Sequence, residues 1–345
     1  MKTRVGILGA TGYTGAELTR LLIRHPNVEI AWLTSEKFSG KKIYEVFPQF
    51  RKFIEIKCSS ISKLKSFENV DLAFSCLPGG KSMHFVERLI QNGTRVIDLS
   101  PDFRFSDYEE YKILHNTEDS CKDLLQSAVY GVPEFYRGKI RDATLVANPG
   151  CYSTSVLYGL APAMVNALLE DGSIKIDSKA GLAGGGRAPV LEHHFSESNE
   201  TALAFGIAKH DQKPEMQKQL SVLSGSPVSL TFVPHRIPVN RGILTTIYSE
   251  LREPMDLERL WKLYLEYYAE SSFIRVCSLG KYPSLKNVRF TNFCDIGIGF
   301  QDDVFITVVV LDNLGKGAAG QAIQNMNIMF GYPDEEGLTI PSMYP

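Results

Sequence analysis

The chain lacks the features of a metal-binding, secreted or membrane protein. Its six cysteines are scattered at positions 58, 76, 121, 151, 277 and 294 without a CxxC pair, so neither a zinc site nor a disulfide framework is indicated. No apolar run approaches the roughly 18–20 residues that span a bilayer. The first residues lead directly into a predicted strand rather than a signal peptide. We therefore expect a cytoplasmic protein that needs no metal.

A strong charge of either sign is also missing. The formal net charge is −2, so no basic field points to nucleic acid or to an anionic membrane as a partner. The hydrophobic content of 44% and charged content of 22% are ordinary for a globular protein. A chain of 345 residues is long enough for two domains with proper cores. These values favour a small molecule as the partner.

A glycine-rich turn follows the first apolar run. Residues 4–8 are predicted to form a strand, 16–23 a helix and 28–33 a second strand, which together make a βαβ unit typical of dinucleotide folds. Glycines allow a tight turn and a close approach of the backbone to a pyrophosphate at the helix N-terminus. A plain glycine turn is the alternative. The expected cofactor contacts are Gly9, Thr11, Gly12, Tyr13, Thr14 and Gly15.

The end of the second predicted strand favours NADP over NAD. An NAD site carries an acidic residue there to hold the ribose 2′-hydroxyl, but here Thr34 and Ser35 precede Glu36 and Lys37. Hydroxyl and ammonium groups suit a 2′-phosphate, so Ser35 and Lys37 are predicted contacts. A solvated loop would explain Lys37, Lys41 and Lys42 equally well. Glu36 is assigned to solvent.

The first half continues as alternating strands and helices. Strands are predicted at 72–76 and 95–99, with a helix at 83–91 between them. Pro78 and Gly79 lie where the first of these strands ends, at the sheet edge where α/β folds bind ligands. The predicted architecture is a Rossmann-type, doubly wound α/β domain.

The second half has a different pattern, which indicates an α+β domain with a mostly antiparallel sheet. Helices are expected at 213–220, 257–268 and 313–330, the last packing back on the first domain. Residues 1–149 and 313–345 are assigned to the cofactor domain, and 150–312 to a catalytic and oligomerisation domain. The expected strands are 174–178, 228–233, 242–250, 273–278, 294–300 and 304–312.

The stretch from Asn148 to Thr154 carries the strongest chemical signal. It places Cys151 after a Pro-Gly turn and before a predicted helix at 153–168. A thiol there feels the positive end of the helix dipole and the N–H groups of the first turn. Both lower the pKa of the thiol, and the thiolate is the nucleophile. A small buried cysteine after a turn is the alternative.

These motifs together resemble the N-acetyl-γ-glutamyl-phosphate reductases, which are related to aspartate-semialdehyde and glyceraldehyde-3-phosphate dehydrogenases. The similarity runs over nearly the whole chain. Its signposts are GATGYTGAEL from Gly9, LPGG from Leu77, DLSPDFRF from Asp98, YGVPEFYR from Tyr130, ANPGCYST from Ala147, VPHRIPVNRGIL from Val233 and GQAIQNMNIMFG from Gly320.

The resemblance implies NADPH-dependent reduction of an acyl phosphate to an aldehyde, with release of inorganic phosphate. Cys151 would form a thioester and His210 would manage the protons. Because histidine titrates near neutral pH, His210 suits that role. The other candidates for it are His193, His194 and His235, the last of which could instead shape the substrate site.

The resemblance also implies anion-binding residues, for which arginine is well suited. Arg104 and Arg187 are the first candidates for the carboxylate and phosphate of the substrate, and Arg241 is the third. Further substrate contacts are expected from Ser153 and Glu215. Asn313, Gly315 and Gly317 are expected near the cofactor.

The chain departs from the family pattern in several places. Ala183 replaces a serine, Asp211 and Gln212 follow His210 where the family has Arg-His, and Ser153 replaces a proline. Ile113, Leu114 and His115 replace Trp-Tyr-Gly. These changes leave two alternatives open: the same chemistry on another acyl phosphate, such as a carrier-linked aminoadipyl phosphate, or a catalytically silent NADP-binding sensor. The resemblance further implies a homodimer or homotetramer.

Overall fold

The chain divides into two compact units. The computed structural model describes residues 1–63, 70–115 and 121–343. Unit 1 comprises Met1–Pro149 and Ala318–Thr339, and unit 2 comprises Gly150–Gly317 and Ile340–Pro345. Within the described ranges, no helix is long and apolar enough to cross a membrane.

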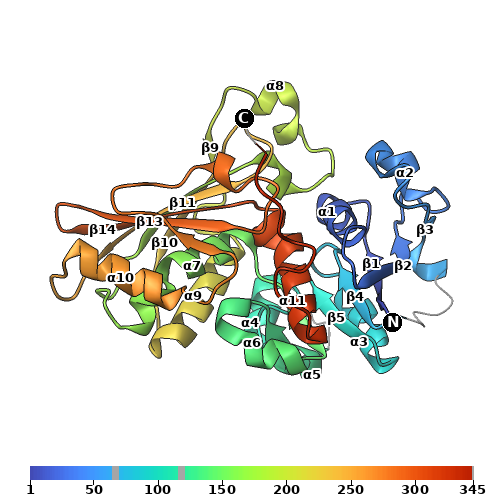
Figure 1. The fold of residues 1–345 in the computed structure, drawn as a ribbon, viewed down its shortest axis with the longest axis horizontal. Helices are drawn as coiled ribbons and strands as arrows, with labels where there is room; N and C mark the ends of the chain where they lie inside the picture. The colour runs from blue at the N-terminus through green and yellow to red at the C-terminus, as the bar shows by residue number, and fades with distance from the viewer. Residues whose placement is uncertain (64–69, 116–120, 344–345) are drawn as a thin grey trace. The chain divides into compact units, whose positions relative to one another are not determined.

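Unit 1 is built on a parallel sheet (Figure 1). Its described strands run in the spatial order β3-β2-β1-β4-β5-β7-β6. In that order they are β3 (Cys58–Ser59), β2 (Val28–Thr34), β1 (Thr3–Leu8), β4 (Leu72–Ser75), β5 (Arg95–Asp98), β7 (Leu145–Ala147) and β6 (Val129–Tyr130). The order reverses at β1 and β4, which makes the carboxyl ends of these strands the ligand-binding edge of such a sheet.

Helices cover both faces of this sheet. The helices are α1 (Tyr13–Leu22), α2 (Ile43–Val46), α3 (Met83–Gln91), α4 (Tyr108–His115), α5 (Lys122–Ser127), α6 (Pro133–Asp142) and α11 (Gly320–Phe330). Side chains of α3, α4 and α5 share one buried cluster with alternate residues of the strands. On the other face, α11 contacts α1, α6 and β5. Because α11 belongs to unit 1 but follows unit 2 in the sequence, one face of this sheet is covered by a segment far from the strands in sequence.

The elements of unit 1 lie close to their predicted positions. α3 spans the predicted residues, and α1 begins at Tyr13 rather than Ala16. α11 belongs to unit 1, but residues 313–317 and 340–345 belong to unit 2, so the predicted assignment of 313–345 to the first domain was too broad. The predicted helix at 313–330 is a π-helical turn, η6 (Gly315–Ala319), followed by α11.

Unit 2 contains a mixed sheet with the described strand order β12-β13-β14-β11-β8-β10-β9. The strands are β12 (Ile274–Val276), β13 (Cys294–Gln301), β14 (Val304–Leu311), β11 (Ile243–Glu250), β8 (Lys175–Ala180), β10 (Thr231–Arg236) and β9 (Leu203–Ala204). The pairs β12–β13 and β8–β10 are parallel, and the other pairs are antiparallel. The prediction of a mostly antiparallel α+β domain is therefore confirmed.

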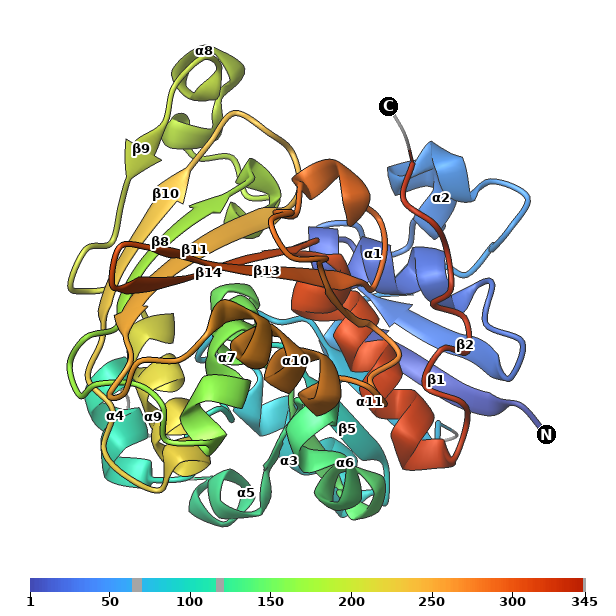
Figure 2. The ribbon, with the colours of Figure 1, turned by 60° about the vertical axis from the view of Figure 1, so that its left-hand side comes forward.

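One face of this sheet is covered by helices (Figure 2). They are α7 (Cys151–Val165), α9 (Gln212–Ser224) and α10 (Leu257–Tyr267), and a further helix, α8 (Phe195–Ser198), lies in the segment before β9. α7 is apolar on nearly all sides, as expected of a helix enclosed by protein, and every residue from Tyr152 to Met164 is buried. A side chain at Gly159 would meet Val309 and Ile247, so glycine lets α7 lie close to the sheet. This contact fixes the helix that begins with Cys151.

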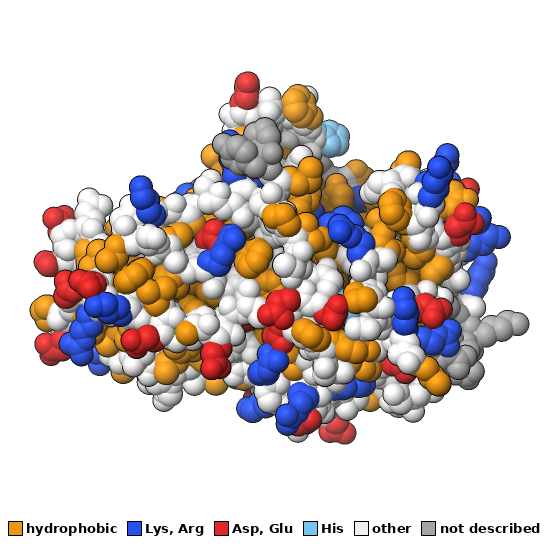
Figure 3. All heavy atoms as spheres, in the orientation of Figure 1, with side chains coloured by type: hydrophobic (Ala, Val, Ile, Leu, Met, Phe, Trp, Pro, Cys, Tyr) orange, Lys and Arg blue, Asp and Glu red, His pale blue; other side chains and the backbone are white. Residues whose placement is uncertain are grey.

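The surface carries both signs of charge. On the face shown in Figure 3, basic and acidic side chains are interspersed rather than separated into fields. This agrees with the net charge of −2. The described side chains on this face therefore form no basic field of the kind that an acidic carrier protein would favour.

Candidate active site

Cys151 and His210 line the same pocket in unit 2. The pocket has a volume of about 110 Å³. Its wall consists of the start of α7, the end of β8 with the glycine turn after it, and the segment that leads into α9. The lining residues are Cys151, Tyr152, Ala180, Gly181, Leu182, Gly184, Gly185, Phe205, His210, Gln212, Arg236 and Asn313.

The N-terminus of α7 is held by side chains of α9. Gly150 is the N-cap residue, and its N–H donates to Glu215 Oε1 at 2.9 Å. The N–H groups of Tyr152 and Ser153 donate to Gln212 Oε1 at 2.9 and 3.1 Å. The sequence predicts a helix at 153–168, after the cysteine, whereas α7 begins at Cys151 itself. The N–H groups of Gly150, Tyr152 and Ser153 are already paired with protein. The helix dipole can still stabilise the thiolate, but these paired N–H groups are not available to donate a hydrogen bond to it.

His210 sits among aromatic rings. Its ring centroid lies 5.2 Å from that of Tyr152 and 5.3 Å from that of Phe232. Burial lowers the pKa of His210, and nearby Asp211 and Glu215 oppose the change. Gln212 N donates to Nδ1 at 3.2 Å, so the neutral ring carries its proton on Nε2. At neutral pH the pocket therefore contains an imidazole that can donate a hydrogen bond.

An unexpected arginine provides the positive charge of the pocket. Arg236 lines the pocket and stacks over Phe205 at 4.5 Å from the ring centroid. By contrast, Arg187 is exposed and is not part of the lining. Arg241 is buried and pairs with Asp312 at 2.9 Å, which makes it a structural residue rather than a substrate ligand. Arg236 follows the Pro-His pair in the quoted motif, and strand alternation could have identified it.

Asn313 lines the pocket with an amide nitrogen that has no hydrogen-bond partner among the described residues. Its side chain is 2% exposed, and Oδ1 accepts a hydrogen bond from Gly242 N at 2.7 Å. Nδ2 is buried and has no hydrogen-bond partner among the described residues. A buried N–H without a partner is costly, so this group is well suited to a carbonyl or carboxamide oxygen of a ligand.

Two predicted substrate residues make contacts between α7 and α9 instead. Ser153 is fully buried, and its hydroxyl faces Gln212 Oε1 at 3.5 Å. Glu215 is 2% exposed and accepts from Gly150 N. Neither residue lines the pocket, so the structure does not support direct substrate contact by either. Both were found by sequence because they neighbour the reactive residues.

The rival histidines lie outside the pocket. His235 Nδ1 is 3.1 Å from Asp177 Oδ1. Because neighbouring strand residues face opposite sides and Arg236 lines the pocket, His235 lies on the other face of the sheet. His193 packs against Gly185, where a Cβ would overlap its ring. His194 is exposed. Of the histidines that the sequence offered, the structure joins His210 to Cys151.

The glycine turn of unit 1 forms an open helix N-terminus. Gly9 has φ +76°, and a Cβ there would lie 2.7 Å from the carbonyl oxygen of Cys76. Thr34 Oγ1 accepts from Gly9 N, and Thr11 Oγ1 and Ser35 Oγ lie 2.7 Å apart. The turn is therefore fixed by the end of β2, and the N-terminus of α1 lies just beyond it.

Glu36 has a structural role that the sequence did not predict. It accepts hydrogen bonds from Ser60 Oγ at 2.7 Å and Ile61 N at 2.8 Å. These bonds lower the pKa of its carboxyl group. Glu36 is thus engaged with its own unit, although it remains exposed to solvent. Lys37 is exposed and lies over the Phe38 ring.

The Pro78–Gly79 turn is clamped by buried carboxylates. Asp102 accepts from Gly80 N at 2.7 Å and Ser82 N at 3.1 Å. Asp98 accepts from Ser82 Oγ and Ser100 Oγ. Burial raises the pKa of Asp98 to about 6. This network fixes the turn at the ligand-binding edge of the parallel sheet.

Arg104 supports the chain that leads to the nucleophile. Its Nε donates to the carbonyl of Asn148 at 3.0 Å, and one terminal nitrogen donates to the carbonyl of Leu99 at 3.1 Å. At least part of its guanidinium group is therefore occupied by backbone. The structure places Arg104 in unit 1 as a residue that positions the turn before Pro149.

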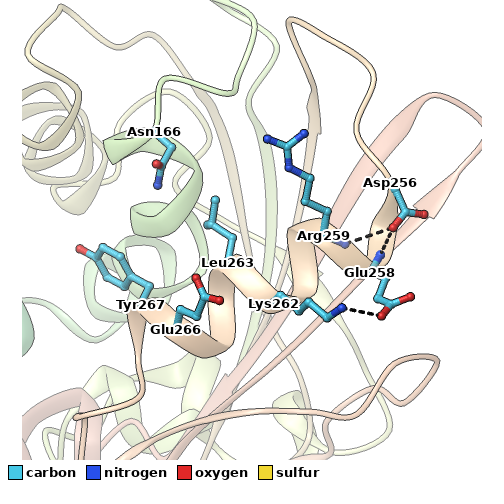
Figure 4. A pocket seen from close by; sticks show the side chains of 8 residues that line it. All are labelled: Asn166, Asp256, Glu258, Arg259, Lys262, Leu263, Glu266 and Tyr267. Carbon is cyan, nitrogen blue, oxygen red and sulfur yellow. Dashed lines mark hydrogen bonds and ion pairs between the residues drawn. The ribbon is translucent and has the colours of Figure 1, made fainter.

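A larger depression on unit 2 lacks the groups for this chemistry. It has a volume of about 730 Å³ and lies along α10 near Asn166 (Figure 4). Asp256 caps α10 by accepting from the N–H groups of Glu258 and Arg259, and Lys262 pairs with Glu258. Its lining contains no cysteine or histidine. Among the described residues, no group of histidine, cysteine and carboxylate side chains could hold a metal ion.

The departures from the family pattern fall in different places. Gln212 is the first residue of α9 and accepts from the N–H of Tyr152 at the start of α7. Ala183 donates its N–H to the carbonyl of Asn240 at 3.0 Å, and Asp211 is exposed. The side chains at Ile113 to His115 lie outside the described part of the structure.

Comparison with known proteins identifies the family. The curated N-acetyl-gamma-glutamyl-phosphate reductase of Pelotomaculum thermopropionicum is 44% identical over 347 residues, covering 100% of both chains. The chain belongs to the N-acetyl-gamma-glutamyl-phosphate reductase family. The protein of the same name from Desulforamulus reducens is 42% identical, and that from Geobacter metallireducens is also 42% identical, each match covering 99% of both chains.

The domain models and solved structures agree with this family. Residues 4–143 match the NAD binding domain of semialdehyde dehydrogenases, and residues 151–313 match their dimerisation domain. The fold is shared with aspartate semialdehyde dehydrogenase II of Vibrio cholerae, with a TM-score of 0.75 at 18% identity, covering 96% of this chain and 99% of that one. The Candida albicans aspartate semialdehyde dehydrogenase with NADP gives a TM-score of 0.72 at 17% identity, covering 96% and 99%. The predicted resemblance and fold are confirmed.

Proposed function

We propose that the chain reduces N-acetyl-γ-glutamyl phosphate to N-acetylglutamate 5-semialdehyde and phosphate with NADPH, a step of arginine biosynthesis. The observation that carries the proposal is the joining of Cys151 and His210 in one pocket of a chain that is 41–44% identical to reductases of that name. The match over the full length favours this substrate over a carrier-linked acyl phosphate and favours an enzyme over a silent sensor.

Cys151 opens the reaction as a thiolate. Its sulfur attacks the carbonyl carbon of the acyl phosphate, a C–S bond forms, and the C–O bond to phosphate breaks with its electron pair leaving on phosphate. The resulting thioester stays attached to the start of α7, whose position is fixed by the sheet and by α9. After reduction, the C–S bond breaks with its electron pair returning to sulfur, the aldehyde leaves and the thiolate is restored.

His210 manages charge on the reacting oxygen. Because its neutral ring carries the proton on Nε2 and accepts from Gln212 N at Nδ1, the ring donates a hydrogen bond to the oxygen that becomes negative during attack. Proton transfer to and from that oxygen follows as the thiohemiacetal collapses. Burial raises the pKa of the Tyr152 phenol, so this neighbour stays neutral and does not compete as a base.

The cofactor proposal is NADPH, held by unit 1. Its residues fit a dinucleotide, because the Gly9 turn could not accept a side chain and leads to the N-terminus of α1. Thr11, Gly12, Tyr13, Thr14 and Gly15 would hold the pyrophosphate. Ser35 and Lys37 would hold the 2′-phosphate, and Pro78 and Gly79 border the same sheet edge. NADPH, when bound, supplies a hydride.

Arg236 is the proposed anion-binding residue in the thiol pocket. It lines the pocket as a cation, and guanidinium groups pair well with carboxylate and phosphate. Asn313 Nδ2 adds a donor for an uncharged oxygen of substrate or cofactor. We expect Arg236→Ala to lower kcat/KM by about 10–100-fold, in line with the loss of a charged hydrogen bond. The exposed Arg187→Ala is the matched control, and an equal loss in both variants would remove Arg236 from the site.

A homodimer or homotetramer in the cytoplasm is part of the proposal. The match of residues 151–313 to a dimerisation domain supports it. So does the face of the unit 2 sheet opposite α7, where Leu244, Ile306 and Val308 remain only half-buried. Light scattering of the purified chain would measure the assembly directly.

The reverse reaction tests the whole assignment. N-acetylglutamate 5-semialdehyde, phosphate and NADP⁺ are mixed with the enzyme, and NADPH absorbance is followed, with NAD⁺ in a parallel sample. Rapid reduction that depends on phosphate supports reaction, substrate and cofactor together. Equal rates with NAD⁺ would overturn the choice of NADP, and no reduction with a reactive Cys151 would overturn the substrate.

A further inference from the structure

Gln212 occupies the N-terminus of the nucleophile helix. Its Oε1 accepts from Tyr152 N at 2.9 Å and Ser153 N at 3.1 Å, the two residues that follow Cys151. Gln212 also lines the pocket beside Cys151 and His210. The same oxygen faces the Ser153 hydroxyl at 3.5 Å. One side-chain atom from α9 thus gathers the polar groups of the first turn of α7.

The turn before Cys151 is shaped to admit this side chain. A Cβ at Gly150 would overlap the carboxamide carbon and oxygen of Gln212. Gly150 N is held by Glu215, which lies one helical turn beyond Gln212 on α9. The contact is therefore built from both sides, by a missing side chain on α7 and a pair of acceptors on α9.

The chemistry of the acceptor matters at this position. An amide oxygen has two lone pairs and can accept both N–H groups, whereas an imidazole nitrogen can accept only one. The amide is also neutral, so it pairs the N–H groups without placing a negative charge beside the sulfur. A carboxylate in its place would oppose ionisation of the thiol. Because the Ser153 N–H donates to Gln212, it does not donate to the sulfur of Cys151, two residues earlier in the sequence.

We propose that Gln212 is a positioning residue, which fixes Cys151 on the first turn of α7 and leaves its sulfur directed to substrate rather than to the helix N–H groups. The role follows from the shared acceptor oxygen and the space at Gly150. It rests on the proposed thiol chemistry, but it concerns the reactivity of the sulfur before any substrate binds. It accounts for a glutamine where the family usually has histidine.

Other charged groups near Cys151 also influence the pKa of its thiol. His210 and Arg236 share the pocket, Glu215 lies beneath Gly150, and η6 packs on Cys151 through Gly317. Titratable and charged groups on the packed elements include Tyr152, His210, Asp211, Lys213, Glu215, Lys218, His235, Arg236, Asp312 and Lys316. All of them stay unchanged in the variants below, so a shift between variants reports on position 212.

The test is the pH dependence of Cys151 alkylation by iodoacetamide in the full chain without substrate. Gln212→Glu keeps the shape and the acceptor but adds a charge, so we expect the alkylation midpoint to rise by about one pH unit and the rate at pH 7 to fall about 5–10-fold. Gln212→Leu frees the N–H groups, so the midpoint should fall while kcat drops about tenfold or more at every pH. Gln217→Glu, the same change further along α9, is the control.

The outcomes separate this proposal from the function itself. Opposite shifts for the Glu and Leu variants, with Gln217→Glu like wild type, support it. Wild-type midpoints and kcat in both Gln212 variants would overturn it, as would lowered thermal stability with an unchanged pH profile. Gln212→His, if the first two variants fold poorly, should lose part of the kcat because it accepts one N–H instead of two, and full activity with an unchanged midpoint would again contradict the proposal. Alkylation needs no acyl phosphate, so a wrong substrate assignment leaves the result readable.

Discussion

Two helices of this chain begin after a parallel strand and a glycine turn, yet their N-termini differ. At α1, no described side chain accepts a hydrogen bond from the N–H groups of Tyr13 or Thr14. At α7, the N–H groups of Gly150, Tyr152 and Ser153 are all paired with Glu215 or Gln212. The N–H groups at the start of α1 are available to a ligand, whereas those at the start of α7 already donate to side chains of α9.

The difference matches two uses of the same local geometry. A helix that binds a diffusible phosphate needs available N–H groups and a turn without side chains. A helix that presents a reactive side chain needs a fixed first turn, because an error of about 1 Å in the position of a catalytic group can cost about 100-fold in rate. α10 resembles α7 in being closed, through Asp256 (Figure 4). The N-terminus of α1 therefore contrasts with these two closed N-termini.

The largest expected effect comes from removing what the closed terminus presents. Cys151→Ser should lower kcat by more than about 10³-fold, because a serine hydroxyl is a far weaker nucleophile than a thiolate. NADPH affinity, measured by fluorescence titration, should be unchanged, since the proposed dinucleotide contacts lie in unit 1, whereas Cys151 lies in unit 2. Turnover at the wild-type rate would refute Cys151 as the nucleophile.

The next effect tests the partner of the thiol. His210→Asn should lower kcat/KM by about 10²–10⁴-fold, the usual contribution of a positioned acid or base. Because burial lowers the pKa of His210, the wild-type enzyme should keep its activity as pH falls through 6.5 and lose it only below. That acidic limb should disappear in the variant. Near-normal kinetics would move the role to another group.

Sequence reasoning could predict those parts of the two N-termini that depend on neighbouring residues, but not those that depend on residues far apart in the sequence. The Gly9 turn and Cys151 are both recognisable because the signals are local: glycines after a strand, and a thiol before a helix. Gln212 and Arg236 were missed because their roles arise from α9 and β10 folding onto α7. Ser153 and Glu215 were predicted as substrate contacts, and in the structure they are hydrogen-bonded to Gln212 and Gly150, because the sequence does not tell which way a buried side chain is turned. The assignment of Asn313 to a ligand stays a prediction.

A pair of matched glycine variants would break the comparison directly. Gly9→Ala places a Cβ at φ +76° and 2.7 Å from Cys76 O, so NADPH affinity should fall about tenfold or more, in line with roughly 1–2 kcal/mol of backbone strain. Its Cys151 alkylation profile should be unchanged. Gly150→Ala should do the reverse, because its Cβ displaces Gln212. If both variants lose both properties, the two termini do not act separately.

The smallest effect concerns α3, whose start is closed by carboxylates rather than an amide. Burial raises the pKa of Asp98 to about 6, above the value of an exposed aspartate, so the folded state binds a proton more tightly than the unfolded state. The contribution of Asp98 to stability therefore falls as pH rises from about 4 to 6, by at most roughly 1.4 kcal/mol per pH unit. The difference in unfolding free energy between wild type and Asp98→Asn, from urea titrations, should decrease over that range. A constant difference would mean that Asp98 titrates normally.

The return of α11 to unit 1 has a consequence for how the protein is made. Arg95 donates to the carbonyl of Met329 at 2.7 Å, and Asn325 donates to the carbonyl of Gly131 at 2.9 Å, so one face of the first sheet is finished by residues translated nearly last. During synthesis, residues 150–317 of unit 2 can emerge before α11 is translated, while the sheet of unit 1 still has an uncovered apolar surface. A fragment ending at Pro149 would share that condition permanently, and its solubility should depend on supplying the missing helix as a separate peptide.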